Sequence, residues 1–105
     1  MAEISEEIKI KLSKFFEELK KNKINIISAI LFGSYAQGTQ TEYSDIDLAI
    51  VSDDFEGNRY YDLDKIRPAR FAVDTDISVL PYRPEDFKPD DLFVKEILKY
   101  GIKIV

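Results

Sequence analysis

The sequence has 105 residues, a length that fits one domain with one hydrophobic core. It is 45% hydrophobic and 33% charged, which is typical of a globular rather than a disordered chain. The absence of cysteine and histidine excludes disulfides, zinc sites of the Cys/His kind, and thiol or imidazole catalysis. Any bound metal must therefore be a hard cation on oxygen ligands, such as magnesium, manganese or calcium.

Charge and hydropathy narrow the expected location and partners. The start of the chain, MAEISEEIKIKL, is charged and lacks the apolar core of a signal peptide, and no stretch of the sequence reaches the length of a membrane span. We therefore expect a cytoplasmic protein without a membrane partner. The net charge of −5 argues against general nucleic-acid binding, because such binding depends mainly on clustered lysine and arginine.

The first half of the chain predicts a helix, a strand, a turn and a second strand. Residues 3–21 carry apolar side chains at helical spacing and predict an amphipathic helix. Residues 25–33 are apolar, rich in β-branched side chains and too short for a typical helix, so they predict a buried strand. The segment 34–38, SYAQG, predicts one tight helical turn or a loop, and 39–44 a polar connection.

The second predicted strand is 45–51, DIDLAIV. Side chains alternate along a strand, so Asp45 and Asp47 are expected on one face. The opposite face then carries only apolar side chains, which are Ile46, Leu48 and Ile50.

The second half predicts two helices and two strands. A helix at 59–67 is expected to end at Pro68, because proline disrupts a helix interior, and 73–80 predicts the third strand. The three prolines of the following PYRPEDFKP argue against regular structure there. A helix at 90–100, with aspartate in its first turn and Gly101 just beyond it, precedes a short final strand, IKIV.

Two further expectations concern burial. Five phenylalanines lie in apolar patterns and are expected in the core, namely Phe15, Phe16, Phe32, Phe71 and Phe93. The acidic, turn-rich segment 52–56, SDDFE, is expected to be a solvated loop.

Gly33 and Ser34 follow the first predicted strand. Glycine permits backbone conformations and close approaches that a Cβ would block. A helical turn that begins at Ser34 would direct backbone N–H groups at an anion, and the serine hydroxyl can add a hydrogen bond to a phosphate oxygen. The same pair is also common in an ordinary strand-to-helix turn with a serine cap.

The candidate metal ligands are two acidic pairs. On a strand, Asp45 and Asp47 have Cβ atoms about 6–7 Å apart, which suits one divalent ion or brackets two. Without a cation each raises the pKa of the other, although a solvent-facing strand of an antiparallel sheet also permits such a pair. Asp74 and Asp76 form a second pair on the third predicted strand. Together they favour two-metal phosphoryl or nucleotidyl transfer, in which ions about 3.5–4 Å apart stabilise the attacking and leaving oxygens.

The segment FGSYAQGTQTEYSDIDLAIV, residues 32–51, joins Gly33-Ser34 to Asp45-x-Asp47 across a ten-residue interval. It resembles the nucleotidyltransferase superfamily related to DNA polymerase beta, and within it the compact branch of minimal nucleotidyltransferases. The resemblance continues through TDISVLP, which looks like the strand of the third family acid, to the final helix and strand. It implies a single α+β (two-layer α/β) domain over 1–105, with a mixed β-sheet of about four strands and helices packed on one face.

The resemblance also implies roles for individual residues. Gly33 and Ser34 would hold the triphosphate of ATP or another nucleoside triphosphate. Asp45 and Asp47 would ligate Mg²⁺ bound to the phosphates. Asp76 would ligate a second Mg²⁺ ion. It would also accept the proton of the attacking hydroxyl, unless the metal lowers the pKa of that hydroxyl enough for no base to be needed.

Two positions leave alternatives open. Asp76 aligns better than Asp74 as the third acid, because an apolar run follows it, but Asp74 shares its predicted strand face. Gln37 stands where the family often has arginine or lysine. The loss of a cation beside the triphosphate would weaken nucleotide binding.

The implied reaction is transfer of NMP, most simply AMP from ATP, to an acceptor hydroxyl with release of pyrophosphate. Members of the minimal branch commonly pair with a small helical HEPN protein as the antitoxin of a toxin–antitoxin system, and some look able to transfer AMP to a tyrosine of the toxin. Larger relatives carry extra domains for the acceptor, so here a partner protein or a second copy in a homo-oligomer is expected to present it. The alternatives are a catalytically weak or inactive module that neutralises its partner by binding, and a transferase acting on a small molecule or an RNA end.

Overall fold

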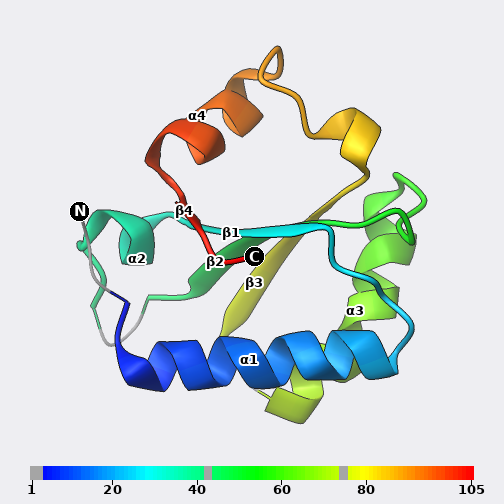
Figure 1. The fold of residues 1–105 in the computed structure, drawn as a ribbon, viewed down its shortest axis with the longest axis horizontal. Coiled ribbons are helices and arrows are strands. Elements are labelled where there is room, and N and C mark those ends of the chain that lie inside the picture. The colour runs from blue at the N-terminus through cyan, green and yellow to red at the C-terminus, as the bar shows by residue number, and fades with distance from the viewer. Residues whose placement is uncertain (1–3, 42–43, 74–75) are drawn as a thin grey trace.

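The computed structural model describes residues 4–41, 44–73 and 76–105. In chain order its elements are α1 (Glu6–Lys21), β1 (Ser28–Phe32), α2 (Ser34–Gln37), β2 (Ile46–Val51), α3 (Arg59–Val73), β3 (Ile77–Tyr82), the 3-10 helix η1 (Pro84–Asp86), α4 (Leu92–Tyr100) and β4 (Ile102–Lys103), as Figure 1 shows. The strands form one sheet in the order β3-β2-β1-β4. β1 is antiparallel to β2 and β4, whereas β2 is parallel to β3. The predicted mixed four-stranded sheet and the α+β class are confirmed.

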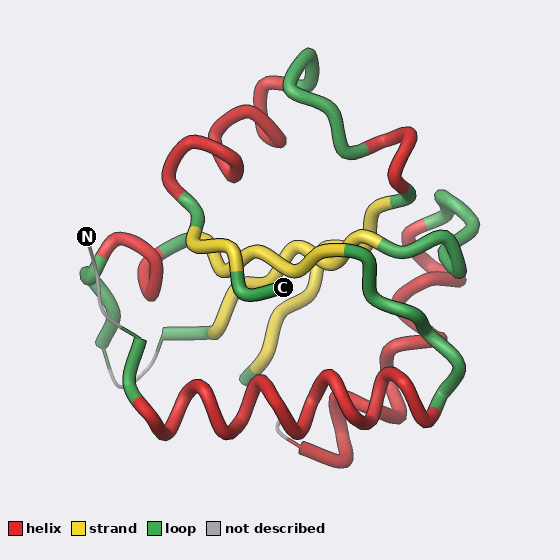
Figure 2. Tube along the Cα trace, in the orientation of Figure 1, coloured by secondary structure: helices red, strands yellow, loops and turns green. Residues whose placement is uncertain are grey.

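The sheet separates two unequal layers (Figures 1 and 2). α1 and α3 cover one face, and their apolar side chains join those of the strands in the main core, which includes Leu31 and Leu48. α4 lies over the opposite face, where Ile97 packs against Ile30 and Ala49 in a smaller cluster. The prediction that the helices pack on one face of the sheet is therefore wrong, because the apolar stripe of α4 covers the second face. The predicted alternation along β2 is confirmed, since its isoleucine and leucine side chains face the main core. Asp47, two residues before Ala49, therefore belongs to the α4 face.

Capping side chains make two helices shorter than the sequence pattern predicts. α1 begins at Glu6 rather than at residue 3 because Ser5 caps it, with its Oγ accepting a hydrogen bond from the Ile8 N–H at 3.3 Å. α4 begins at Leu92 rather than at residue 90 because the Asp91 carboxylate caps its first turn. Within the described ranges, none of the helices is long and apolar enough to cross a membrane.

The prediction that Pro68 ends the third helix is wrong, because α3 continues through it to Val73. A proline inside a helix removes one backbone hydrogen bond and costs about 3 kcal/mol. Ile66 and Ala69, on either side of Pro68, are 1% and 0% exposed and both belong to the main core. Burial of the two halves of α3 against the same sheet face outweighs the local cost.

The prediction of a strand at 73–80 followed by irregular structure is also wrong in its bounds, since β3 runs to Tyr82 and includes Pro81. β3 is an edge strand, and the carbonyls of Asp76 and Tyr82 accept hydrogen bonds from the N–H groups of Ile46, in β2, and Ser52, just after it. By alternation the nitrogen of Pro81 points away from the sheet, where no ladder hydrogen bond is lost. Pro84 occupies the first turn of η1, where the missing N–H is not needed.

Burial differs from the sequence-based expectation at several positions. Phe15 is fully buried, but Phe71 and Phe93 are 65% and 48% exposed, so their prediction as core residues is wrong. Phe93 meets the Phe32 ring of β1 edge-on, with ring centroids 6.0 Å apart, and the rest of its ring is exposed. The segment 52–56 is not simply solvated, because Ser52 and Phe55 are buried.

Candidate functional site

Gly33 connects β1 to α2 and lies against an acidic side chain. Its φ of 73° and ψ of −150° fall in a region that residues with a Cβ rarely adopt. The Asp47 carboxylate occupies the space that a Cβ on Gly33 would need. This contact arises because β1 and β2 pair with Phe32 directly opposite Asp47. The two motifs that the sequence separates by ten residues therefore meet at one end of the sheet.

Asp45 and Asp47 are the acidic pair of this site. Asp47 is half-buried on β2, and Asp45 is exposed just before the strand begins. Burial raises the pKa of Asp47 above its usual range, and the charge of Asp45 raises it further. Among the described residues, none forms an ion pair with Asp45 or Asp47, so the pair keeps its negative charge there. An oxygen-only donor set with such excess negative charge fits a hard divalent cation such as Mg²⁺.

Asp76 lies next to Asp45 in the sheet, but its side chain does not form one cluster with those of Asp45 and Asp47. Its carbonyl accepts a hydrogen bond from the Ile46 N–H at 2.8 Å, so residues 45 and 76 start neighbouring strands. Asp76 lines a cavity of about 360 Å³ together with α1 residues such as Lys11. Over the part of the chain that the structure describes, no group of three acidic, histidine or cysteine side chains is placed to hold one metal ion. Asp74, the alternative third acid, lies outside the described residues.

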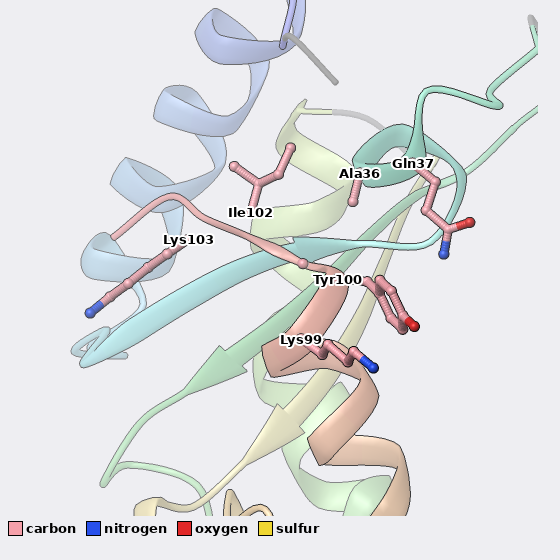
Figure 3. Close-up of a pocket in the computed structure, with 7 residues that line it drawn as sticks. Ala36, Gln37, Lys99, Tyr100, Ile102 and Lys103 are labelled. Atoms are coloured by element: carbon pink, nitrogen blue, oxygen red, sulfur yellow. The ribbon is translucent and has the colours of Figure 1, made fainter. Parts of the chain in front are cut away.

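Ser34 and Gln37 are the first and last residues of α2, the short helix that the sequence predicts after Gly33. The Gly33 carbonyl accepts hydrogen bonds from the N–H groups of Ala36 and Gln37 at 3.1 and 3.2 Å. Gly38 ends the helix in the left-handed conformation. Ser34 is half-buried next to Gly33, whereas the Gln37 side chain is exposed and turns toward α4 (Figure 3).

Two adjoining cavities lie between α2 and α4. The smaller one, of about 320 Å³, is lined by Phe32, Gly33, Gln37, Phe93, Glu96, Ile97 and Tyr100. The larger one, of about 880 Å³, extends from Gln37 and Tyr100 to β4, as Figure 3 shows. Sequence reasoning did not select the α4 residues, because Phe93, Glu96 and Tyr100 have the same helical spacing as residues that face a core.

Comparison with known proteins defines the class to which this fold and site belong. Residues 10–104 match the family model described as the nucleotidyltransferase domain. The chain therefore belongs to the nucleotidyltransferase domain family. The resemblance found in residues 32–51 is confirmed at the level of the family.

Two similar proteins come from Methanocaldococcus jannaschii, and each is named a "putative protein adenylyltransferase". The first is 36% identical over 92 residues, which cover 82% of this chain and 58% of the relative. The second is 46% identical over 44 residues, which cover 42% of this chain and 41% of the relative. The chain therefore spans little more than half the length of the first relative and less than half that of the second.

Three solved structures share the fold. A toxin–antitoxin structure with AMP-PNP has a TM-score of 0.63 at 24% identity, and a mutant of the MntA–HpeT toxin–antitoxin has 0.61 at 22%; each match covers 89% of this chain and 71% of the other. A "putative nucleotidyltransferase" from Sulfolobus solfataricus has a TM-score of 0.58 at 16% identity, covering 98% of this chain and 89% of the other. At these identities the likeness is one of fold.

The burial of the charged Asp47 carboxylate, with the charge of Asp45 nearby, leads to a prediction about stability. Asp47→Asn is expected to raise the free energy of unfolding near neutral pH when divalent cations are removed with EDTA. Because the folded-state pKa of Asp47 is raised, the stability contributed by its protonated form is complete below 3.8 and is lost as the pH rises through the folded-state pKa. The gain from asparagine should therefore shrink as the pH falls toward 3.8.

Urea unfolding curves at neutral and acidic pH measure this effect. Asp53→Asn, which changes an exposed aspartate in the loop after β2, is the matched control and should leave stability nearly unchanged. If Asp47→Asn raises the free energy of unfolding by the same amount in acid, the negative charge of Asp47 is not the cause of the increase.

Proposed function

We propose that this protein is a Mg²⁺-dependent nucleotidyltransferase that moves AMP from ATP to an acceptor hydroxyl. The observation that carries the proposal is the Asp45–Asp47 pair at the start of β2, with the Asp47 carboxylate against the backbone of Gly33. Membership of the nucleotidyltransferase domain family supports the reaction type. The names of the two archaeal relatives support adenylyl transfer to a protein.

The transfer would proceed by displacement at the α-phosphorus of ATP. The acceptor oxygen forms a bond to that phosphorus, the bond to the oxygen bridging the α- and β-phosphorus atoms breaks, and pyrophosphate leaves. Asp45 and Asp47 would hold Mg²⁺, which when bound neutralises charge on the phosphates. The Ser34 hydroxyl, half-buried beside Gly33, would donate a hydrogen bond to a phosphate oxygen. Asp76, beside Asp45 at the start of β3, is the proposed acceptor of the hydroxyl proton.

The finer proposal concerns the acceptor. We propose that it is a tyrosine of a helical HEPN-type partner protein, and that this protein acts as the antitoxin of that pair. Support comes from the fold, which is shared with toxin–antitoxin structures, one of them with AMP-PNP. It also comes from the match of residues 32–51 to the minimal branch of the family, whose members commonly have such partners.

A second candidate is a binding module that neutralises its partner by forming a complex, with little or no transfer. The neutral, exposed Gln37 favours it, because Gln37 stands where the family often has a cation. The acidic residues oppose it, because Asp45, Asp47 and Asp76 are all present in the sequence.

Incubation with ATP labelled at the α-phosphate, Mg²⁺ and the product of the neighbouring open reading frame tests both candidates. The transferase is expected to place label on the partner, and mass spectrometry should locate one added AMP on a tyrosine. ATP labelled at the γ-phosphate serves as the control and should leave the partner unlabelled. A stable complex that carries no label would overturn the transferase and support the binding module.

A further inference from the structure

We infer that the outer face of α4 is the docking surface for the partner protein, which binds there through a helix whose apolar stripe is flanked by acidic side chains. The inference rests on the part of the proposed function in which a partner protein presents the acceptor. It adds the surface and the chemistry that bring this partner to the site. The outer face consists of Leu92, Phe93, Lys95, Glu96, Lys99 and Tyr100.

The outer face exposes more apolar side chains than the folding of the domain requires. α4 already has a buried side, on which Val94 and Ile97 are almost fully buried. Leu92, Phe93 and Tyr100 are nevertheless 79%, 48% and 53% exposed. Of the ten large hydrophobic residues that are exposed in the described ranges, four belong to the nine residues of α4. Single exposed apolar residues are ordinary, but a contiguous group of them marks an interaction site.

The shape and length of the outer face suit a helix. The six residues line an open cavity of about 540 Å³, which can receive apolar side chains of a partner. Leu92 and Tyr100 are eight residues apart, which corresponds to about 12 Å along the axis of α4. An amphipathic helix that binds a groove presents anchors at i, i+3 or i+4 and i+7, over about 10 Å. One such helix therefore matches the length of the outer face.

The charges of the outer face favour an acidic partner. Lys95, Glu96 and Lys99 make no ion pair within the described ranges. Lys99 instead lies against the Tyr100 ring, with its Nζ 5.2 Å from the ring centroid (Figure 3). Two lysines against one glutamate leave this face positive, although the whole chain has a net charge of −5. Carboxylates beside the apolar stripe of the partner helix would pair with the two lysines.

A second copy of this chain fits the outer face less well. In a twofold dimer the same positive face would stand on both sides of the interface. Antiparallel pairing of two α4 helices, with Leu92 opposite Tyr100, would also set one Glu96 against the other. Like charges placed together in this way disfavour association. An acidic helix from another protein meets neither difficulty.

The position of the outer face connects docking to the acidic pair. Its cavity shares Phe93, Glu96 and Tyr100 with the smaller cavity between α2 and α4. Gly33 also lines that smaller cavity, and the Asp47 carboxylate lies against Gly33. A partner on the outer face would therefore lie beside the proposed site of transfer, whereas a partner on α1 would lie across the sheet from it (Figure 1).

Calorimetric titration of the full chain with the product of the neighbouring open reading frame measures docking without nucleotide. Leu92→Asp should weaken the complex at least about tenfold, because it places a charge in an apolar contact. Ile10→Asp is the matched control, since Ile10 is 55% exposed on α1, and the affinity should not change. Thermal melts establish that both variants fold. Leu92→Asp should also keep the rise in melting temperature with Mg·ATP, because Leu92 does not line the cavities beside α2.

Charge reversal tests the acidic character of the partner helix. Lys95→Glu should weaken the complex about tenfold at low salt and less at high salt, because dissolved ions screen the interaction. Lys14→Glu makes the same change at an exposed position on α1 and should leave the affinity unchanged. A Lys95→Glu variant that binds as tightly as the unaltered protein would overturn the acidic character of the helix.

Crosslinking identifies the segment of the partner that binds. The chain has no cysteine, so Leu92→Cys can carry a single photo-crosslinker at the centre of the proposed contact. Mass spectrometry should find the crosslink in one amphipathic segment of the partner with Asp or Glu beside its apolar positions. The same crosslinker on Ile10→Cys should give no crosslinked partner. A crosslink from residue 92 to a basic segment would overturn the inference.

The outcomes separate the docking surface from the proposed function. Unchanged affinity in both Leu92→Asp and Lys95→Glu would overturn the surface even where AMP transfer occurs. Loss of the complex in these variants, with a partner that the unaltered protein never labels, would support the surface and overturn the transfer reaction. Self-association that Leu92→Asp abolishes while the partner still binds would assign the face to a second copy and overturn the inference. Absence of any complex would overturn both the surface and the proposed partner.

Discussion

Asp45→Asn and Asp47→Asn are each expected to lower the rate of AMP transfer by at least about a hundredfold while leaving the fold intact. Asparagine keeps the size of the side chain and removes the charge that would hold Mg²⁺. Each variant leaves only one of the two carboxylates proposed to hold the ion. Initial rates with ATP labelled at the α-phosphate measure the loss.

A ligand-dependent melt shows whether these variants fail at metal and nucleotide binding. The melting temperature of the unaltered protein should rise with Mg²⁺ and further with Mg·ATP, since ligands that bind only the native state stabilise it. Both variants should lose most of this rise, whereas Asp53→Asn should keep both the rise and the transfer rate. Wild-type rates in both Asp45→Asn and Asp47→Asn would disprove the metal-site assignment. A melting temperature of the unaltered protein that neither Mg²⁺ nor Mg·ATP raises would also contradict the assignment.

Gly33→Ala is expected to lower the free energy of unfolding by about 3 kcal/mol and to abolish transfer as well. A Cβ at this position destabilises the fold for two reasons. The φ of 73° with ψ of −150° is nearly exclusive to glycine, and the Asp47 carboxylate already occupies the space. The chain must either displace Asp47 or rebuild the turn into α2, and each change separates the acidic pair from the phosphate side of the site.

Gly38→Ala is the matched control for this variant. Gly38 has nearly the same φ, 74°, but its ψ of 19° lies in the left-handed helical region, where alanine costs only about 1–2 kcal/mol. Gly38 also ends α2 rather than contacting the acids. Urea unfolding curves and transfer rates for the two variants should therefore diverge. Equal stability of Gly33→Ala and the unaltered protein would show that the close approach of Asp47 does not constrain residue 33.

Features governed by local geometry were predictable from the residues alone. The alternation of acidic and apolar side chains along 45–51 predicted which face of β2 is buried, because a strand repeats every two residues in any fold. The apolar stripe of α1 was predictable because a helix repeats about every 3.6 residues, whereas the sequence left 34–38 open as a helical turn or a loop. The motif of residues 32–51 identified the family, and with it the residues proposed for the phosphates and the metal.

Features that depend on packing were not predictable in this way. Pro68 remains inside α3 because burial of its neighbours against the sheet outweighs the lost hydrogen bond, and no local pattern contains that balance. Likewise, Phe93 reads as a core residue in the sequence, but α4 crosses only part of its sheet face and leaves it half-exposed beside the site.

The residues of 32–51 therefore predict, without any coordinates, that a glycine-serine turn and an acidic pair belong to one site. The register between β1 and β2 brings Asp47 onto Gly33, and the course of the chain after β3 brings Glu96 and Tyr100 beside them. Strand register and helix placement depend on burial summed over the whole core, so they arise only when distant segments pack together.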